Sequence, residues 1–231
     1  MLFGGLQKIT LVDYPGKVAA TVFAAGCNFR CPYCHNPELV LPELIKKQPK
    51  IKEKEILDFL TERKKLLEGI CITGGEPTIQ SDLIDFIKKV KDLGFLIKLD
   101  TNGSNPKALK ELIKDNLLDF IAMDIKGSLD EYDKITNVKI DIKKIKESIK
   151  IIKDFKEYEF RMTVLPLFHS NKDFDKIGKI LKGSKIFCIQ QFRPKGCLDQ
   201  NFEQEEQFSL KELEEFKKML EKYIEKVKIR N

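Results

Sequence analysis

The chain has 231 residues, of which 42% are hydrophobic and 34% are charged, and it carries a formal net charge of +6. Such a balance is typical of a globular protein with one sizeable core, and the sequence has no run of about 18 apolar residues that would predict a membrane-spanning helix. The first residues lack the features of a secretory signal, so we expect a cytoplasmic protein with no membrane partner. The lysines are spread along the whole chain, which favours a solvated surface over a nucleic-acid interface.

Apolar stretches and helical spacings alternate along the chain. A short edge strand at 6–11 and a proline-glycine turn at 13–16 come first. The later stretches that are typical of strands lie at 17–25, 70–73, 95–99, 120–123, 160–165 and 186–191. Helices are predicted between and after them, at 51–67, 83–93, 107–116, 141–153, 174–181 and 209–228. The segment 37–49 is interpreted as a proline-punctuated connection.

Six strand-and-helix units in alternation predict right-handed βαβ connections and a parallel sheet. A complete eight-unit barrel takes about 250 residues, so six units predict an open, partial (β/α)6 barrel of the α/β class. We expect a single domain over residues 1–231, with a core at about 17–194 and a C-terminal helix at 209–228 that caps the barrel.

Three cysteines lie within eight residues, directly after the strand predicted at 17–25. Cys27, Cys31 and Cys34 have the spacing C-x3-C-x2-C, which lets three thiolates converge on one soft metal centre. Three protein ligands would leave one iron of a four-iron cluster open to a substrate or cofactor. The alternatives are a zinc site with His35 as fourth ligand, a disulfide framework and three buried apolar cysteines. The spacing favours iron–sulfur over these, because zinc sites usually combine two separated ligand pairs and a disulfide needs an oxidising compartment.

Three further polar loops also follow predicted strand ends, where barrel enzymes build their sites. Gly74-Gly75 would let the backbone approach a ligand closely, and Glu76 could offer a carboxylate to an ammonium group. The loop 100–103 offers acceptors and donors for ribose hydroxyls or a small cation, although an Asx-type turn is the simpler interpretation. Asp124 and Lys126 lie two apart at a strand end, so their side chains point the same way and could form an ion pair.

These motifs resemble those of a known superfamily. The cysteine motif, with the aromatic Tyr33 before its last cysteine, and the later Gly74-Gly75-Glu76-Pro77 are similar to the radical S-adenosylmethionine (radical SAM) superfamily. More narrowly, the stretches 5–17, 31–38 and 98–104 resemble the activating proteins of anaerobic ribonucleoside-triphosphate reductases. The resemblance covers about residues 5–194, and pyruvate formate-lyase activating enzymes are similar to the same stretches.

The resemblance implies a [4Fe-4S] cluster on Cys27, Cys31 and Cys34, with S-adenosylmethionine bound to the open iron. It implies reductive cleavage of that cofactor to a 5′-deoxyadenosyl radical, which takes a hydrogen from a glycine of a partner enzyme. The electron would come from outside, from a flavodoxin or ferredoxin. The cofactor-binding positions that the resemblance implies are Gly74, Gly75 and Glu76 for the methionine amino group, Tyr33 and His35 for the adenine end, Asp124 and Lys126 as an Asp-x-Lys contact, and Asp100 and Asn102 for the ribose side or a cation.

The sequence departs from the resemblance at the last predicted strand. Pyruvate formate-lyase activating enzymes have a histidine there that meets the cofactor, and the stretch 190–194 has none. His169 follows an earlier strand and is interpreted as a loop residue. Cys71 and Cys188 lie within strands and are predicted to be core residues, whereas Cys197 is predicted to be exposed.

Two other functions stay open. One is a radical enzyme that acts on a small molecule, such as a deazapurine or a nucleotide. The other is a zinc or iron–sulfur module that binds nucleic acid without catalysis; it would need a basic stripe with interleaved aromatic residues, and the lysines follow helix faces instead.

Overall fold

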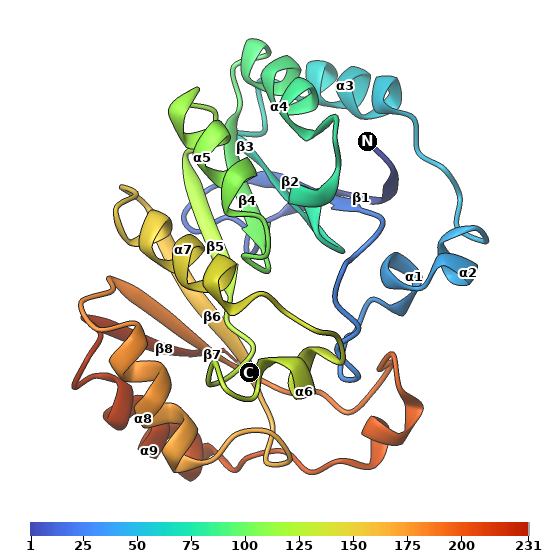
Figure 1. Ribbon diagram of the computed structural model, residues 1–231. Coiled ribbons are helices and arrows are strands. Elements are labelled where there is room, and N and C mark those ends of the chain that lie inside the picture. Colours follow the sequence, from blue (N-terminus) through green and yellow to red (C-terminus); the bar gives the residue numbers. More distant parts are fainter. Residues whose placement is uncertain (231) are drawn as a thin grey trace. The chain divides into compact units, whose positions relative to one another are not determined.

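The computed structural model describes residues 1–230, and its chain divides into two compact units. The first unit comprises Met1–Asn28, Asn36–Thr101 and Asn105–Ile121, and the second comprises residues 29–35, 102–104 and the chain from 122 onward. The chain passes from the first to the second unit within strand β5 (Figure 1). Among residues 1–230, no helix is both long and apolar enough to cross a membrane.

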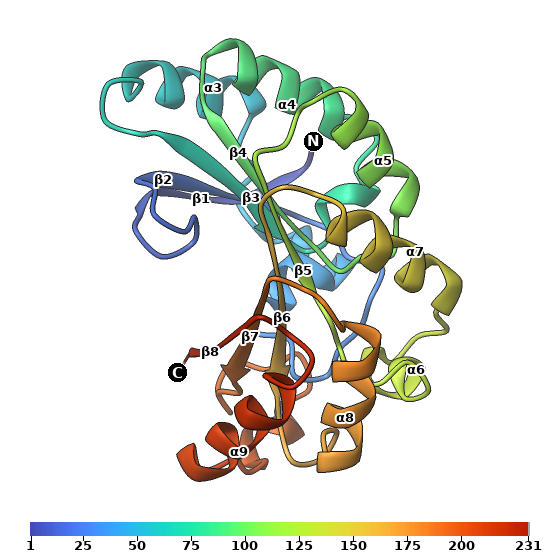
Figure 2. The same ribbon diagram turned by 90° about the vertical axis from the view of Figure 1, so that its left-hand side faces the viewer.

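The first unit is a sheet with the strand order β1-β2-β3-β4-β5. Its strands are β1 (Phe3–Thr10), β2 (Ala19–Ala24), β3 (Gly69–Gly74), β4 (Leu96–Thr101) and the start of β5 (Phe120–Asp124). Its helices are α1 (Pro37–Val40), α2 (Pro42–Ile45), α3 (Glu53–Glu62), α4 (Leu83–Asp92) and α5 (Pro106–Lys114), with a short 3₁₀ helix η1 at Pro77–Ile79. Figures 1 and 2 both show α3, α4 and α5 on the same side of these strands.

Strands β2, β3 and β4 pair in parallel, as the alternation of strands and helices predicted. Strand β1 is antiparallel to β2 and has no other neighbour in the strand order, so the predicted edge strand is confirmed, although it begins earlier than predicted. Three neighbouring positions of β2, β3 and β4 pair with one another, namely Thr21, Cys71 and Lys98. Their side chains therefore lie on the same face of the sheet. All three are buried, so this face carries polar groups that need partners.

The second unit continues the order as β5-β6-β7-β8. Its strands are the end of β5, β6 (Tyr158–Val164), β7 (Ile186–Gln191) and β8 (Lys226–Arg230). Its helices are α6 (Tyr132–Thr136), α7 (Ile142–Lys153), α8 (Asn171–Ile180) and α9 (Leu210–Leu220), with a 3₁₀ helix η2 at Gln200–Gln204. Both end strands, β1 and β8, pair on one side only, which is the open sheet of the predicted α/β class.

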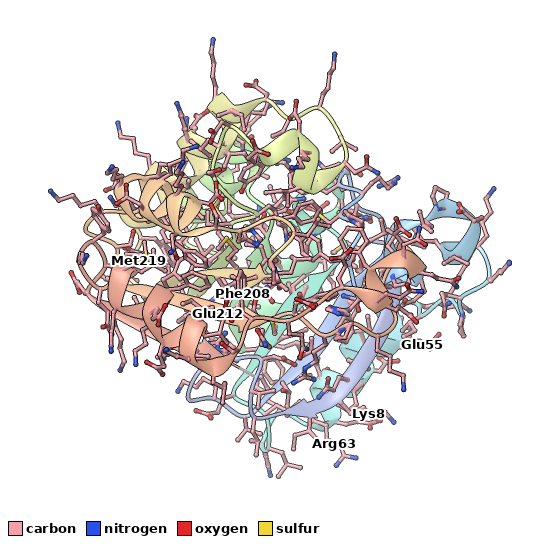
Figure 3. All side chains as sticks on the ribbon, turned by 90° about the horizontal axis from the view of Figure 1, so that it is seen from below. Lys8, Glu55, Arg63, Phe208, Glu212 and Met219 are labelled. Atoms are coloured by element: carbon pink, nitrogen blue, oxygen red, sulfur yellow. The ribbon has the colours of Figure 1, made fainter. Side chains whose placement is uncertain are left out.

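The C-terminal helix is shorter than predicted. Helix α9 begins at a capping box between Ser209 and Glu212 and ends at Leu220, and Figure 3 labels Glu212 and Met219 along it. The predicted extension to residue 228 is wrong, because the stretch after it alternates charged and apolar side chains and forms β8, parallel to β7. The segment 37–49 also differs from the prediction, since it contains the two short helices α1 and α2.

Candidate functional site

In the first unit, the chain just before Cys27 is fastened to the loop after β3. The carbonyl of Gly26 accepts a hydrogen bond from the N–H of Glu76 (2.8 Å), and the N–H of Gly26 donates to the carbonyl of Leu39 (2.7 Å). The side-chain amide of Gln80 donates to the carbonyl of Ala25 (2.8 Å). The start of the cysteine loop and the Gly74-Gly75-Glu76 loop, which the sequence separates by almost fifty residues, therefore lie against each other.

The two glycines of that loop are required by this contact. A Cβ atom at Gly75 would lie 2.1 Å from the carbonyl oxygen of Gly26, and Gly74 has a φ of +110°, a conformation that favours glycine. Because Gly74 and Gly75 have no side chains, the backbone at the start of the cysteine loop can pack directly against them. Contact of the same glycines with a cofactor stays a prediction.

We expect Gly75→Ala to lower the free energy of unfolding by about 1–3 kcal/mol, because the new methyl group would overlap backbone atoms that cannot move aside cheaply. The matched control is Gly5→Ala, where the nearest atom to a new Cβ is a side-chain carbon of Phe23 at 3.3 Å. Urea denaturation of the two variants checks this expectation. Equal losses of stability in both variants would contradict it.

Glu76 is fully buried and serves as the cap of η1. Its Oε1 accepts hydrogen bonds from the N–H of Thr78 (3.1 Å), from the hydroxyl of Thr78 (2.5 Å) and from the hydroxyl of Thr101 (2.7 Å). These donors hold a buried carboxylate in one orientation. The predicted role of Glu76 toward an ammonium group would therefore use a carboxylate whose position is already set.

Asp100 has a cationic partner that the sequence analysis missed. The buried ammonium of Lys98 is paired with the Asp100 carboxylate and lies 3.6 Å from the Sγ of Cys71. Lys98 and Asp100 are two apart on β4, so the period of the strand could have indicated this pair. The predicted role of Asp100 toward a ribose or a cation is untested by these contacts.

In the second unit, the rest of the cysteine loop is held by the chain that follows β7. The carbonyl of Cys34 accepts from the N–H of Leu198 (2.8 Å), and the carbonyl of Pro32 accepts from the N–H of Asp199 (2.9 Å). His35 is exposed, lies 2.6 Å through its Nε2 from the carbonyl oxygen of Arg193, and stacks on the ring of Phe192. The stretch 190–194, which lacks the expected histidine, is thus in contact with a histidine from the cysteine loop.

A group of buried and half-buried polar residues lies around Lys126, whose own side chain is 19% exposed. The Cys31 thiol, the Tyr33 hydroxyl and the Asp124 carboxylate all interact electrostatically with the Lys126 ammonium. Burial lowers the pKa of Lys126, but these neighbours raise it more, so that it lies well above its ordinary value and the ammonium is charged at neutral pH. Burial raises the pKa of the Cys31 thiol to about 11, against the effect of Lys126. A thiolate at this position therefore gains from a bound cation such as a metal.

Asp124 and Lys126 form the predicted ion pair, with 3.6 Å between Oδ2 and Nζ. Asp124 also has a closer cation, since the Nε of Arg161 on β6 donates to its Oδ1 at 2.5 Å. Sequence analysis missed Arg161 because 37 residues separate it from Asp124. The available signal was a charged residue inside a predicted buried strand.

Asn102 forms the Asx-type turn that was the simpler interpretation of its loop. Its side-chain oxygen accepts a hydrogen bond from the N–H of Ser104 (2.9 Å).

His169 is a buried loop residue, as predicted. Its Nδ1 accepts from the N–H of Leu165 (3.2 Å), and its Nε2 lies 2.9 Å from the carbonyl oxygen of Lys126, to which it donates in the neutral tautomer. Burial lowers the pKa of His169 below its ordinary value.

Because the folded protein favours neutral His169, the unfolded chain takes up its proton first as the pH falls. The contribution of His169 to stability is therefore complete above about pH 6.5, the ordinary value, and is lost as the pH falls below it. We expect urea unfolding to show that the wild-type protein is less stable at pH 5.5 than at pH 7.5. This difference should be smaller in His169→Gln. His35→Gln serves as control, since it removes the exposed histidine; an equal change in both variants would contradict this assignment.

The cysteines outside the motif are all in the interior. Cys71 and Cys188 are fully buried, as predicted, whereas the prediction of an exposed Cys197 is wrong. The loop that carries Cys197 folds back on the cysteine motif through Leu198 and Asp199, and this covers the thiol. None of the six cysteines forms a disulfide, so a disulfide framework is absent from residues 1–230. Over the same residues, no three His, Cys, Asp or Glu side chains are already arranged to hold a metal ion, so the metal ligands stay a prediction of the motif.

Residues 21–179 match the radical SAM superfamily. The chain belongs to this superfamily. The match contains the cysteine motif, the Gly74-Gly75-Glu76 loop, Asp100, Asn102, Asp124 and Lys126. The cofactors of radical SAM enzymes are a [4Fe-4S] cluster and S-adenosylmethionine, as the resemblance implied.

Relatives support the narrower resemblance to activating enzymes. A Methanocaldococcus jannaschii protein, provisionally named as a glycyl-radical enzyme activating enzyme, is 37% identical over 99% of this chain and 95% of its own length. The pyruvate formate-lyase-activating enzyme of Clostridium pasteurianum is 34% identical over 52% of this chain and 50% of its own. The fold is similar to that of Streptococcus suis SuiB bound to the precursor peptide SuiA, with a TM-score of 0.69, 12% identity, and coverage of 91% of this chain and about half (48%) of SuiB. This radical SAM protein thus resembles the glycyl-radical enzyme activases in sequence and the wider superfamily in fold.

Proposed function

We propose that this radical SAM protein is an activase that generates a glycyl radical on a partner enzyme, with an anaerobic ribonucleoside-triphosphate reductase as the expected partner. The observation that carries the proposal is the half-buried Asp124–Lys126 ion pair, the Asp-x-Lys pattern of glycyl-radical activases, beside the buried Cys31 and Tyr33. The similarity to an activating enzyme over 99% of the chain supports the same assignment.

Each predicted residue has a role in this proposal. Cys27, Cys31 and Cys34 would hold the cluster, and the methionine amino group of the cofactor would meet Gly74, Gly75 and Glu76. The chemistry of the residues fits these groups: a buried thiol beside a cation, and a Tyr33 hydroxyl that is buried without a hydrogen-bond partner. The remaining positions proposed to contact S-adenosylmethionine are Tyr33, His35, Asp100, Asn102, Asp124 and Lys126.

When bound, the cluster and S-adenosylmethionine supply a one-electron reductive cleavage that gives methionine and a 5′-deoxyadenosyl radical. The protein residues bind and orient. Lys126 would offer its ammonium to the cofactor carboxylate, while Arg161 holds Asp124 so that the carboxylate keeps its position when the lysine is engaged. The electron would come from an external flavodoxin or ferredoxin.

An anaerobic cleavage assay tests the proposal. The protein is reconstituted with iron and sulfide, reduced, and given S-adenosylmethionine with or without the reductase, and 5′-deoxyadenosine is measured by chromatography. We expect the reductase to raise product formation to about one equivalent per radical site. If the reductase does not change the cleavage of S-adenosylmethionine but nucleotides or purines stimulate it, the small-molecule alternative is favoured instead.

A further inference from the structure

The main chain of Lys126 is held from both sides by buried side chains. The N–H of Lys126 donates to the hydroxyl oxygen of Tyr132 (3.1 Å), and the carbonyl of Lys126 accepts from Nε2 of His169 (2.9 Å). Tyr132 is fully buried and His169 is 2% exposed. Two polar side chains from different segments, α6 and the loop after β6, thus satisfy both main-chain polar groups of a single residue.

The two side chains are themselves fixed. The Nδ1 of His169 accepts from the N–H of Leu165, which sets the tautomer that donates to Lys126. The adjacent Gly127 packs closely, since a Cβ there would lie 2.3 Å from a side-chain carbon of Ile135 on α6. The chain at Lys126 therefore has little freedom to shift toward or away from α6.

The ammonium of Lys126 is directed at the proposed cofactor site. It pairs with Asp124 at 3.6 Å and interacts electrostatically with Cys31 and with Tyr33, whose hydroxyl has no hydrogen-bond partner. A lysine has four side-chain torsions, so the position of its ammonium depends strongly on where its main chain is held. Small displacements of a binding group reduce its contribution sharply.

We propose that Tyr132 and His169 are positioning residues, which hold the main chain of Lys126 so that its ammonium meets a carboxylate of the bound cofactor. The inference rests on the cofactor contact proposed above for Lys126. It assigns a function to two residues that the sequence analysis named neither as cluster ligands nor as cofactor contacts.

The chain offers a matched pair of variants for the test. Tyr158 is also buried, and its hydroxyl accepts from the N–H of another lysine, Lys185, at the same 3.1 Å. Tyr132→Phe and Tyr158→Phe therefore remove the same atom and leave the same kind of donor unpaired. We expect similar falls in Tm for the two variants, of a few degrees.

Binding of S-adenosylmethionine distinguishes a positioning role from a structural one. On the reconstituted protein, we expect Tyr132→Phe to raise the dissociation constant about tenfold and Tyr158→Phe to leave it unchanged. A loss of this size is typical when a residue that holds a binding residue in place is removed. The rate of cofactor cleavage at saturation should change less than the dissociation constant. Equal affinities in Tyr132→Phe and Tyr158→Phe would overturn the proposal, as would an unchanged affinity in Lys126→Met.

A second measurement needs no cofactor. In the protein without cluster, hydrogen exchange at the amide of Lys126 should accelerate in Tyr132→Phe, and exchange at the amide of Leu165 should accelerate in His169→Leu. Unchanged exchange at both amides would also overturn the proposal. Neither readout involves a partner enzyme, so the absence of a glycyl radical would contradict the proposed function and leave this inference standing.

Discussion

Cys31→Ala is expected to abolish cluster binding and cleavage of S-adenosylmethionine. The wild-type chain should take up about four irons per chain on anaerobic reconstitution, and the variant should retain almost none, because two thiolates cannot hold a cluster that already has one open iron. The structural cost should be small, since Cys31 lies in a loop whose backbone is held by its neighbours. Iron analysis, the visible absorption of the cluster and chromatography of 5′-deoxyadenosine measure the effect.

The control for this variant is Cys188→Ala. Cys188 is also buried, in β7, and lies outside the motif, so its loss should lower stability without removing iron. Loss of iron in Cys188→Ala, or full iron and product in Cys31→Ala, would contradict the assignment of the motif as the cluster site. Stable zinc in place of iron in the wild type would favour the binding-module alternative.

Arg230→Met is expected to lower the free energy of unfolding by about 3 kcal/mol. Arg230 on β8 makes two hydrogen bonds, of 2.9 and 2.8 Å, to the carboxylate of Glu159 on β6, whose side chain is only 2% exposed. Removal of the guanidinium leaves a buried carboxylate without its cation, and such uncompensated charges are among the costliest single changes. Urea denaturation at neutral pH measures the loss.

The double variant Glu159→Met/Arg230→Met provides the comparison. Because neither charge remains, it should recover much of the stability that Arg230→Met loses. Glu159→Gln alone should cost less than Arg230→Met, since the arginine side chain is 36% exposed and can turn to solvent. A double variant as unstable as the sum of two large losses would show that the pair acts through packing rather than charge.

The parallel strands and the loops at their ends were predictable because their patterns are local. Apolar runs such as 70–73 and 120–123 each form one strand, and Asp124 and Lys126 are close in sequence as well as in space. Strand β8 was missed because its lysines continue the lysine pattern of α9, and only pairing with β7 distinguishes the two.

Partners that come from distant segments were beyond the sequence. Nothing local indicates that Arg161 pairs with Asp124, that Thr101 donates to Glu76, or that the loop 193–199 buries Cys197. These contacts depend on how strands and loops meet in the fold. The same contacts orient side chains that the sequence analysis identified as candidate site residues but could not place.

The most direct test of the proposed activase is electron paramagnetic resonance of its partner. The reconstituted, reduced protein is mixed with S-adenosylmethionine and an anaerobic ribonucleoside-triphosphate reductase from the same organism, with a reductase whose radical glycine is changed to alanine as control. We expect a glycyl-radical signal in the intact reductase and none in the alanine control, together with 5′-deoxyadenosine. Abundant 5′-deoxyadenosine with no protein radical in the intact reductase would contradict this expectation.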